Sequence, residues 1–304
     1  QALLPEYLCR LGLTATPERH FDDEGTDFLL DFFGGIVSEF TIADGLSWVN
    51  PLTGQSPLCE YEYEPVFVGL DNDEVEDWLS ITRAIVRLGA QRDQETEEKR
   101  KLLLIKRAAI AKSARQKPEL LGSLIRQLLP IKHCLIYCSD SEQLDEVMEV
   151  LNRLGRITYR KFTGHEGTAP RSDLGGLSER EHILQSFAEG VIEVLVAIKC
   201  LDEGVDVPAA SIGIILASSK NRREFVQRRG RLLRRAPGKE KARIFDFVVA
   251  PDFPKKGNEE VASVAAKVIG SELERVVEFA QSAINSVSVG TKVLAKVADL
   301  EIDS

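Results

Sequence analysis

Arginine side chains are concentrated in the segment Glu224–Arg235. Five of them fall within eight positions, namely Arg228, Arg229, Arg231, Arg234 and Arg235. These cations repel one another and are expected to gain nothing from a core. Arg231 and Arg234 are three residues apart and project from one face of a helix, where two guanidinium groups can clamp a polyphosphate during phosphoryl transfer. An ordinary basic surface helix is the alternative. Gly230 costs a helix about 1 kcal/mol relative to alanine, which predicts that something approaches the backbone there.

An acidic loop follows the apolar run Val194–Ile198. Such a run is typical of a strand buried on both faces of a parallel sheet, and ligands of these sheets bind where the strands end. In the loop, the Asp206 carboxylate is able to accept hydrogen bonds from a ribose, and Gly204 allows the backbone to come close. The alternative is a helix N-terminus, where the macrodipole favours acidic residues.

A third segment is Leu13-Thr14-Ala15-Thr16-Pro17. It follows residues 9–13, which are expected to form a short buried strand. Taken alone, threonine and proline after a strand most often make a turn. Thr14 and Thr16 therefore indicate a function only in combination with the other two segments.

Strands and helices are expected to alternate between residues 131 and 250. Apolar runs predict strands at 133–138, 157–162, 192–198, 212–217 and 243–249, and helical periodicity predicts helices at 141–154, 178–190 and 221–235. This order, with its short links, predicts an α/β fold with a doubly wound parallel sheet. Residues 73–129 have the periodicity of a helical bridge. Residues 258–285 are also expected to be helical, with a break at Gly270, a capping box at Ser271–Glu274 and a loose end from Gly290.

The composition excludes several classes of protein. The chain has 304 residues, enough for about two structural units, and 43% of them are hydrophobic and 29% charged. No apolar run approaches the roughly 20 residues that span a bilayer and no signal peptide is found, so no membrane association is expected. The five cysteines are odd in number and lie mostly in apolar runs, which favours free thiols in a reducing cytoplasm and predicts no structural metal.

Basic residues gather in two segments of an acidic chain. The formal charge is −9, yet residues 99–132 and 220–243 each carry a net charge of +9. This asymmetry predicts an anionic ligand at defined places. The basic side of residues 99–117 is expected either to follow a nucleic-acid backbone or to be a solvated helical surface.

In this order and at these intervals, the three segments together resemble motifs of the superfamily 2 helicases and translocases. The matching segments are Leu13–Pro17 for motif III, Leu135–Asp140 for motif IV, Glu203–Asp206 for motif V and Gln227–Arg234 for motif VI. Phe162–Gly164 and the helix at 178–190 also fit, so the resemblance covers about residues 1 to 250. Gln227 at the head of motif VI and Leu-Leu-Arg at its end are most similar to the double-stranded-DNA branch, which includes repair helicases of the Xeroderma B type and restriction-enzyme motors.

The resemblance implies a role at the nucleotide for several residues. Arg231 and Arg234 would be arginine fingers that reach ATP across a cleft between two RecA-like lobes. Gln227 would hold the γ-phosphate region. Gly204 and Asp206 would contact the ribose and couple it to DNA. The implied cofactors are ATP and Mg²⁺.

The resemblance also implies contacts with a DNA backbone, which give salt-dependent and largely sequence-independent binding. These contacts would come from Ser139, Thr163, Gly164 and Lys199. Many relatives have threonine at the end of the motif V strand, where this chain has Ile198, so Lys199 is the candidate for that phosphate contact. Double-stranded DNA is the expected partner.

Part of a phosphoryl-transfer site is missing from the sequence. No DExH metal motif precedes Thr14, no G-x-x-x-x-G-K-[ST] phosphate loop occurs in the chain, and Asp71–Glu74 is interpreted as a helix N-terminus. The chain is therefore expected to be a piece of a longer protein, whose own N-terminal RecA-like lobe holds ATP and Mg²⁺ and is its partner. Thr14 and Thr16 would link hydrolysis to lobe movement. No ATPase activity is expected from this chain alone.

Four units are predicted: the end of a first RecA-like lobe with a connector at residues 1–70, a helical bridge at 71–130, a second RecA-like lobe at 131–254 and a helical extension at 255–304. The predicted function is that of the C-terminal part of an ATP-dependent DNA helicase or translocase. One alternative is a non-catalytic nucleic-acid-binding or partner-docking module, which would not need Gln227 and two phosphate-binding arginines. The other alternative is an RNA helicase.

Overall fold

The computed structural model describes residues 9–14, 22–89, 93–198, 207–216, 222–251 and 259–299. Its centre is a six-stranded, all-parallel sheet with the strand order β1-β6-β5-β2-β4-β3. The strands are β1 (Glu60–Val68), β2 (Cys134–Cys138), β3 (Tyr159–Phe162), β4 (Val194–Ile198), β5 (Ile212–Ile215) and β6 (Lys241–Val249). The predicted α/β class with a doubly wound parallel sheet is confirmed.

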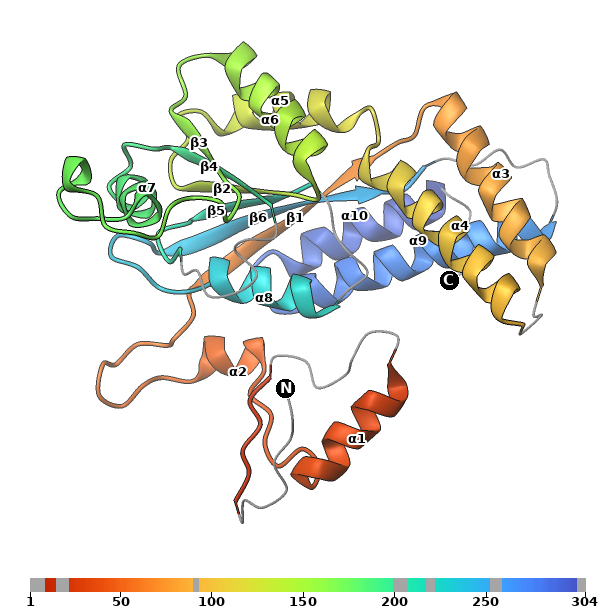
Figure 1. Ribbon diagram of the computed structural model, residues 1–304, viewed down its shortest axis with the longest axis horizontal. Coiled ribbons are helices and arrows are strands. Elements are labelled where there is room, and N and C mark those ends of the chain that lie inside the picture. The colour runs from red at the N-terminus through yellow and green to blue at the C-terminus, as the bar shows by residue number, and fades with distance from the viewer. Residues whose placement is uncertain are drawn as a thin grey trace.

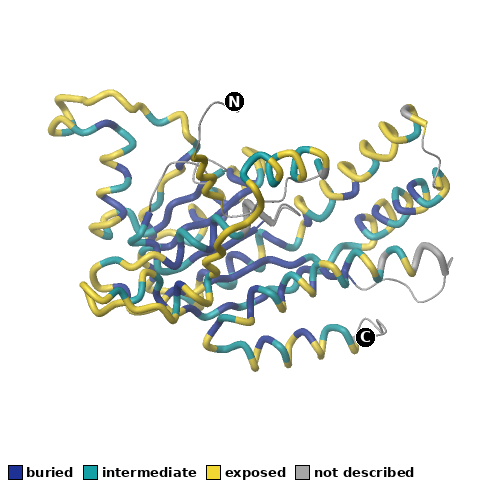
Figure 2. Tube along the Cα trace, turned by 90° about the horizontal axis from the view of Figure 1, so that it is seen from below, coloured by how far each residue is buried: buried dark blue, intermediate teal, exposed yellow. Residues whose placement is uncertain are grey.

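Helices cover both faces of this sheet (Figure 1). On one face lie α5 (Lys117–Leu128) and α6 (Ser141–Leu154). On the other lie α7 (Glu179–Ala188), α8 (Arg222–Leu232), α9 (Glu259–Ala280) and α10 (Ser286–Asp299), with a short 3₁₀ turn, η1 (Ser172–Leu174), before α7. In β2, Leu135 and Tyr137 face the α7–α10 side, whereas Cys134 and Ile136 face α5 and α6. The strands β2, β4, β5 and β6 are therefore buried along most of their length, whereas the edge strands β1 and β3 are only partly buried (Figure 2).

A pair of helices, α3 (Asn72–Leu88) and α4 (Gln94–Lys112), packs beside α9. A capping box at Asp71–Glu74 begins α3, which confirms the predicted helix N-terminus. Arg107 of α4 is buried, lies over the Trp78 ring at 5.0 Å and donates a hydrogen bond to Thr82 Oγ1 at 3.3 Å. Because Arg107 and Lys117 are both buried, the basic side of residues 99–117 is not a continuous surface.

Three local expectations are wrong. Residues 9–13 are exposed and form no strand, since no other strand lies beside them in the described ranges. α9 continues through Gly270, and Ser271 Oγ donates back to the Val268 carbonyl at 2.8 Å instead of capping a new helix. A loose end from Gly290 is not found within the described residues, because α10 continues to Asp299.

The edge strand β1 comes from residues that were expected to belong to the first lobe and connector. It pairs in parallel with β6 over its whole length, from Glu60 opposite Lys241 to Val68 opposite Val249. The division of the chain at residues 70, 130 and 254 stays a prediction. Before β1 lie α1 (Asp23–Phe33) and α2 (Ile42–Ser47). None of the helices in the described ranges combines the length and apolar character that a bilayer-spanning segment needs.

Candidate functional site

The arginine-rich helix α8 packs on the sheet through Leu232 and Leu233, which are buried. Leu232 approaches Gly213 on β5 so closely that a Cβ at Gly213 would lie 2.3 Å from a Leu232 methyl carbon. Glycine at this position therefore lets the end of the helix contact the strand. α8 ends at Leu232, and Arg234 follows in an antiparallel bridge with Leu58. The placement of Arg234 thus depends on this bridge as well as on helical spacing.

Two of the five arginines point into the core. Arg228 is 3% exposed, and its guanidinium lies over the Tyr137 ring at 5.3 Å. Arg229 is 7% exposed and lies over the Phe279 ring of α9 at 4.5 Å. Burial lowers the pKa of Arg229, and its Nε has no hydrogen-bond partner among the described residues. The expectation that these arginines gain nothing from a core is wrong for this pair, because aromatic rings distant in sequence receive them.

The burial of Arg228 and Arg229 turns the neighbouring positions outward. Gln227 and Arg231 are four residues apart on the same side of α8, and both are half-buried. Arg234 is exposed just past the end of the helix. The structure therefore keeps all three predicted nucleotide-contacting residues of this segment outside the core. A Cβ at Gly230 would have nothing within 4 Å, so no described group makes the close approach that was expected there.

Lys239 holds the end of α8 on one side. Its Nζ donates to the backbone carbonyls of Leu232 at 2.6 Å, Arg234 at 2.8 Å and Pro208 at 3.1 Å. Sequence reasoning missed this residue. A lysine directly after Gly238 and shortly after a helix was the available signal, since basic side chains often bond the last carbonyls of a helix.

Residues of the connector before β1 bind the end of α8 and the residues that follow it from a second side. The Cys59 backbone N–H donates to the Leu233 carbonyl at 2.8 Å. Arg235 Nε donates to the Ser56 carbonyl at 2.7 Å, and its Nη2 donates to Ser56 Oγ at 3.0 Å. Together with the bridge between Leu58 and Arg234, these bonds attach the backbone around Arg234 to the residues just before β1.

The predicted backbone-contacting segments lie at one edge of the sheet. Ser139 follows β2 and Thr163–Gly164 follows β3, and β4 lies between these two strands. Because the carboxyl ends of parallel strands meet at the same edge, the structure brings these segments to neighbouring places. Thr14 is exposed at the end of the described range 9–14. Four predicted site residues lie outside the described ranges, namely Thr16, Lys199, Gly204 and Asp206.

The backbone N–H groups of Thr163 and Gly164 form an anion seat that a carboxylate of the same chain fills. Glu166 Oε1 accepts hydrogen bonds from Thr163 N at 2.7 Å and Thr163 Oγ1 at 3.1 Å, and Oε2 accepts one from Gly164 N at 2.7 Å. The φ of 87° at Gly164 favours glycine. Partial burial acts to raise the pKa of Glu166, but the bonds from the seat outweigh it and lower that pKa below its usual value.

The loop after β2 is tied to the end of α4. Ser139 N–H donates to Gln143 Oε1 at 2.9 Å, and Ser139 Oγ donates to Asp140 Oδ2 at 2.6 Å. Gln143 is buried, and its Nε2 donates to the Lys112 carbonyl at 2.9 Å. A movement of α4 would therefore reach the Ser139 loop through one amide side chain.

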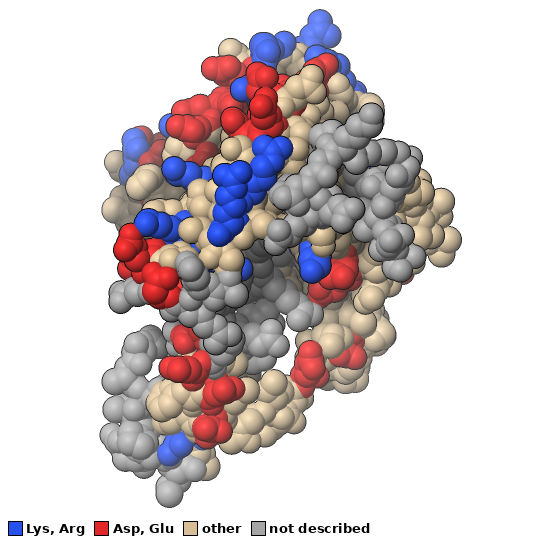
Figure 3. Space-filling model, turned by 90° about the vertical axis from the view of Figure 1, so that its right-hand side faces the viewer, with Lys and Arg blue, Asp and Glu red and all other residues tan. Residues whose placement is uncertain are grey.

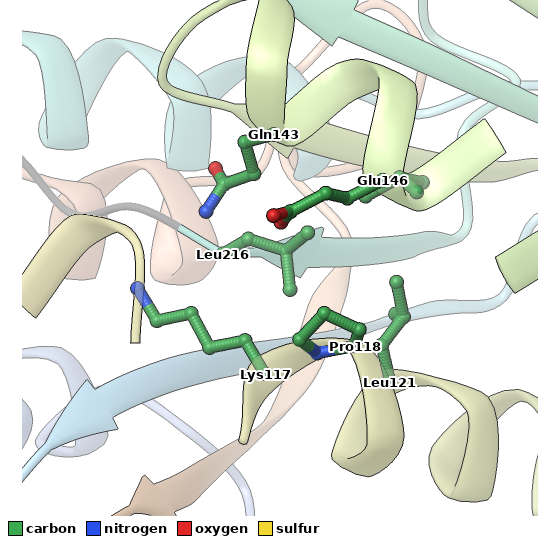
Figure 4. A pocket seen from close by; sticks show the side chains of 7 residues that line it. Lys117, Pro118, Leu121, Gln143, Glu146 and Leu216 are labelled. Carbon is green, nitrogen blue, oxygen red and sulfur yellow. The ribbon is translucent and has the colours of Figure 1, made fainter. Parts of the chain in front are cut away.

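Gln143 also lines a small hollow of about 200 Å³ beside Lys117, Glu146 and Leu216 (Figure 4). Burial lowers the pKa of Lys117 to about 8. Its Nζ donates to the carbonyls of Ala111 at 2.7 Å and Lys112 at 2.9 Å, at the end of α4. Because the amine already donates to backbone carbonyls, the hollow is a packing feature between α5, α6 and Leu216 after β5.

The described residues offer donors for an anion and no metal site. They contain no group of three or more His, Cys, Asp or Glu side chains placed to hold a metal ion. On the face shown in Figure 3, Lys and Arg side chains lie beside Asp and Glu side chains, so this face is not uniformly basic. Recognition of an anion on this face therefore depends on individual side chains and backbone groups.

Comparisons with known proteins identify part of the chain. Residues 116–236 match the model of the helicase conserved C-terminal domain. The chain is 29% identical over 238 residues to the DNA 3'-5' translocase XPB2 of Sulfurisphaera tokodaii, which covers 74% of this chain and 50% of that protein. An uncharacterized protein of Mycobacterium tuberculosis is 40% identical over 85 residues, 28% of this chain and 14% of the relative. The chain thus spans half or less of the length of these curated relatives.

Solved structures with related folds are more distant. The SWI2/SNF2 ATPase core of Sulfolobus solfataricus in complex with dsDNA is 11% identical, with a TM-score of 0.47, and the match covers 92% of this chain and 57% of that chain. The C-terminal part of the Fun30 ATPase domain is 14% identical, with a TM-score of 0.44, and the match covers 72% of this chain and 99% of that chain.

Proposed function

We propose that the chain is the C-terminal part of an ATP-dependent DNA helicase or translocase of superfamily 2. The match of residues 116–236 to the helicase conserved C-terminal domain and the similarity to a DNA translocase support this proposal. The observation that carries the proposal is the division of the arginines of motif VI. Arg228 and Arg229 are taken up by packing, whereas Arg231 and Arg234 stay outside the core within the matched range. A clamp that binds only nucleic acid does not need this second pair beside Gln227.

At the nucleotide, Arg231 and Arg234 would bind phosphate oxygens, and Gln227 would orient the γ-phosphate region. Guanidinium groups fit this task because they bind phosphate in a bidentate manner and stay charged at every physiological pH. ATP would supply the free energy of hydrolysis, and Mg²⁺ would neutralise phosphate charge when the nucleotide is bound. The carboxylates that hold Mg²⁺ would come from a separate N-terminal RecA-like lobe.

At the DNA, the segments at Ser139 and Thr163–Gly164 would contact the phosphate backbone. Their position at neighbouring strand ends supports this role, as does the capacity of the anion seat to bind an oxyanion. The similarity to a relative named a DNA translocase supports DNA as the nucleic acid that the protein binds. That this DNA is double-stranded is part of the proposal. A reducing cytoplasm is the proposed compartment, supported by the free thiols of Cys59, Cys134 and Cys138.

The test is ATP hydrolysis by the full-length protein without nucleic acid and with duplex DNA, single-stranded DNA or RNA. Duplex DNA is expected to stimulate hydrolysis, and Arg231→Ala is expected to reduce kcat by about 10³-fold, the usual effect of losing an arginine finger. Arg153→Ala, an exposed arginine of α6, is the matched control and should keep the wild-type rate.

Each alternative has its own outcome in this assay. Absence of hydrolysis under every condition would favour the non-catalytic binding module. Stimulation by RNA and not by DNA would favour an RNA helicase. The chain of residues 1–304 alone is expected to hydrolyse no ATP above background.

A further inference from the structure

The Lys239 ammonium group donates three hydrogen bonds to backbone carbonyls. The residue is 9% exposed, and an ammonium group can donate several hydrogen bonds at once. The acceptors are the carbonyls of Leu232, Arg234 and Pro208, at distances from 2.6 to 3.1 Å. A buried cation with three short charge-assisted bonds holds its partners in a narrow range of positions.

The three carbonyls come from two segments that are distant in the sequence. Leu232 ends α8, where the last carbonyls lack helical partners and carry the negative end of the helix dipole, and Arg234 follows in motif VI. Pro208 lies two residues after predicted motif V in the sequence and is within the described residues. One ammonium group therefore joins the segment predicted to bind the phosphates to the chain at Pro208.

The local sequence places Lys239 for this purpose. The Lys239 backbone N–H donates to the Ala236 carbonyl at 3.1 Å, which closes a tight turn after the helix. Gly238 supplies the φ of 75° that this turn needs. The turn returns the chain toward α8, so that the lysine side chain meets the carbonyls from below the helix end.

We propose that Lys239 is a positioning residue for the phosphoryl-transfer site, and that it acts by fixing the backbone of Arg234 relative to Pro208. The inference rests on the proposed function. Lys239 itself touches neither nucleotide nor DNA. It acts through Arg234, whose backbone is held on its other side by the bridge to Leu58. A displacement of about 1 Å at a group that stabilises the transition state can lower a rate by about 10²-fold.

The test is a double-mutant cycle in the full-length protein. Lys239→Met, Arg234→Ala and the double variant are compared for kcat and KM in DNA-stimulated ATP hydrolysis, for duplex DNA affinity and for thermal unfolding. Methionine keeps the length of the side chain and removes its charge. The matched control is Lys241→Met, which removes an exposed lysine that pairs with Glu62 at 2.5 Å.

If Lys239 acts through Arg234, Lys239→Met lowers kcat by about tenfold or more, with DNA affinity within about twofold of wild type. In the Arg234→Ala background the same change has no further effect on kcat, because the group that it positions is gone. Lys241→Met keeps the wild-type kcat. If the role of Lys239 is purely structural, the fold-losses in kcat of Lys239→Met and Arg234→Ala multiply in the double variant, and that result overturns the proposal. A wild-type kcat in Lys239→Met also overturns it.

Two further outcomes are distinguishable. A wild-type kcat in Arg234→Ala overturns the proposed function and this inference together, whereas a reduced kcat with multiplying losses overturns this inference alone. If Lys239→Met does not fold, Lys239→Arg replaces it in the cycle. The planar fork of arginine cannot reproduce three convergent donors, so a loss of about threefold or more that disappears with Arg234→Ala is expected. A wild-type kcat in Lys239→Arg, or losses that multiply, would then overturn the proposal.

Discussion

Replacing Glu166 by alanine is expected to strengthen the binding of duplex DNA to the full-length protein. The Glu166 carboxylate occupies the anion seat, where it accepts three hydrogen bonds of 2.7 to 3.1 Å from Thr163 and Gly164. A DNA phosphate that uses the same donors must first displace this carboxylate. The alanine variant leaves the donors available to the phosphate.

The size of the effect follows from the bonds that have to be exchanged. Hydrogen bonds to a charged group contribute about 1.5 to 3 kcal/mol each in favourable cases. A DNA phosphate in the seat would make most of the hydrogen bonds that Glu166 makes now. Because Glu166 is only partly buried, its removal is expected to strengthen DNA binding by a net amount of about 1.4 kcal/mol, or tenfold in Kd. Removing a single charge about 10 Å from a phosphate in water contributes only about 0.4 kcal/mol, or twofold.

A control variant separates these two contributions. Glu179→Ala removes an equal charge from a neighbouring residue, whose Oε2 accepts one hydrogen bond from Gly167 N at 3.2 Å and none from the anion seat. Fluorescence anisotropy with a labelled duplex, at several salt concentrations, measures Kd for both variants. An equal increase in DNA affinity in the two variants would mean that only the loss of one negative charge matters. An unchanged DNA affinity in Glu166→Ala would refute the assignment of the seat to a DNA phosphate.

Three further predictions concern stability. Gly230→Ala should raise the free energy of unfolding by about 0.5 to 1 kcal/mol in urea denaturation, because a helical Cβ there meets nothing within 4 Å, and a decrease would contradict this. Arg107→Ala should lower the free energy of unfolding by about 2 kcal/mol through loss of its contacts with α3, whereas Lys106→Ala, an exposed neighbour, should change it by less than about 0.5 kcal/mol. Ser178→Ala should cost about 1 kcal/mol because it removes the capping box of α7, and an unchanged thermal midpoint would argue against that contribution.

Local signals in the sequence predict the elements of the second lobe well. The helix predicted at 178–190 corresponds to α7, which begins with a capping box at Ser178–Glu181, and the helix predicted at 141–154 has the bounds of α6. The buried runs become the central strands, because an apolar run between helices has few other places in an α/β fold. Such signals depend on residues within a few positions of one another, and these are visible in a single sequence.

Contacts between distant residues explain the errors. Helical spacing tells which residues share a face of α8, but not which face meets the sheet. Arg228 and Arg229 are inward because Tyr137 and Phe279, far away in the sequence, provide rings for their guanidinium groups. The place of β1 in the sheet depends in the same way on β6, about 180 residues later. At Ser271 the sequence carries the signature of a helix start, yet packing on the sheet keeps α9 continuous.

The same contacts determine which residues of motif VI can reach a ligand. Arg228 with Leu232, and Arg229 with Leu233, form two inward pairs with a spacing of four residues. Once these positions are buried, Gln227 and Arg231 must lie on the remaining side of the helix. A buried arginine with an unpartnered Nε contributes less to stability than a well-packed apolar side chain would. Packing energy alone therefore does not account for Arg229, and its contact with α9 makes the C-terminal helices part of the frame that holds Arg231 and Arg234, the arginines that we propose bind phosphate.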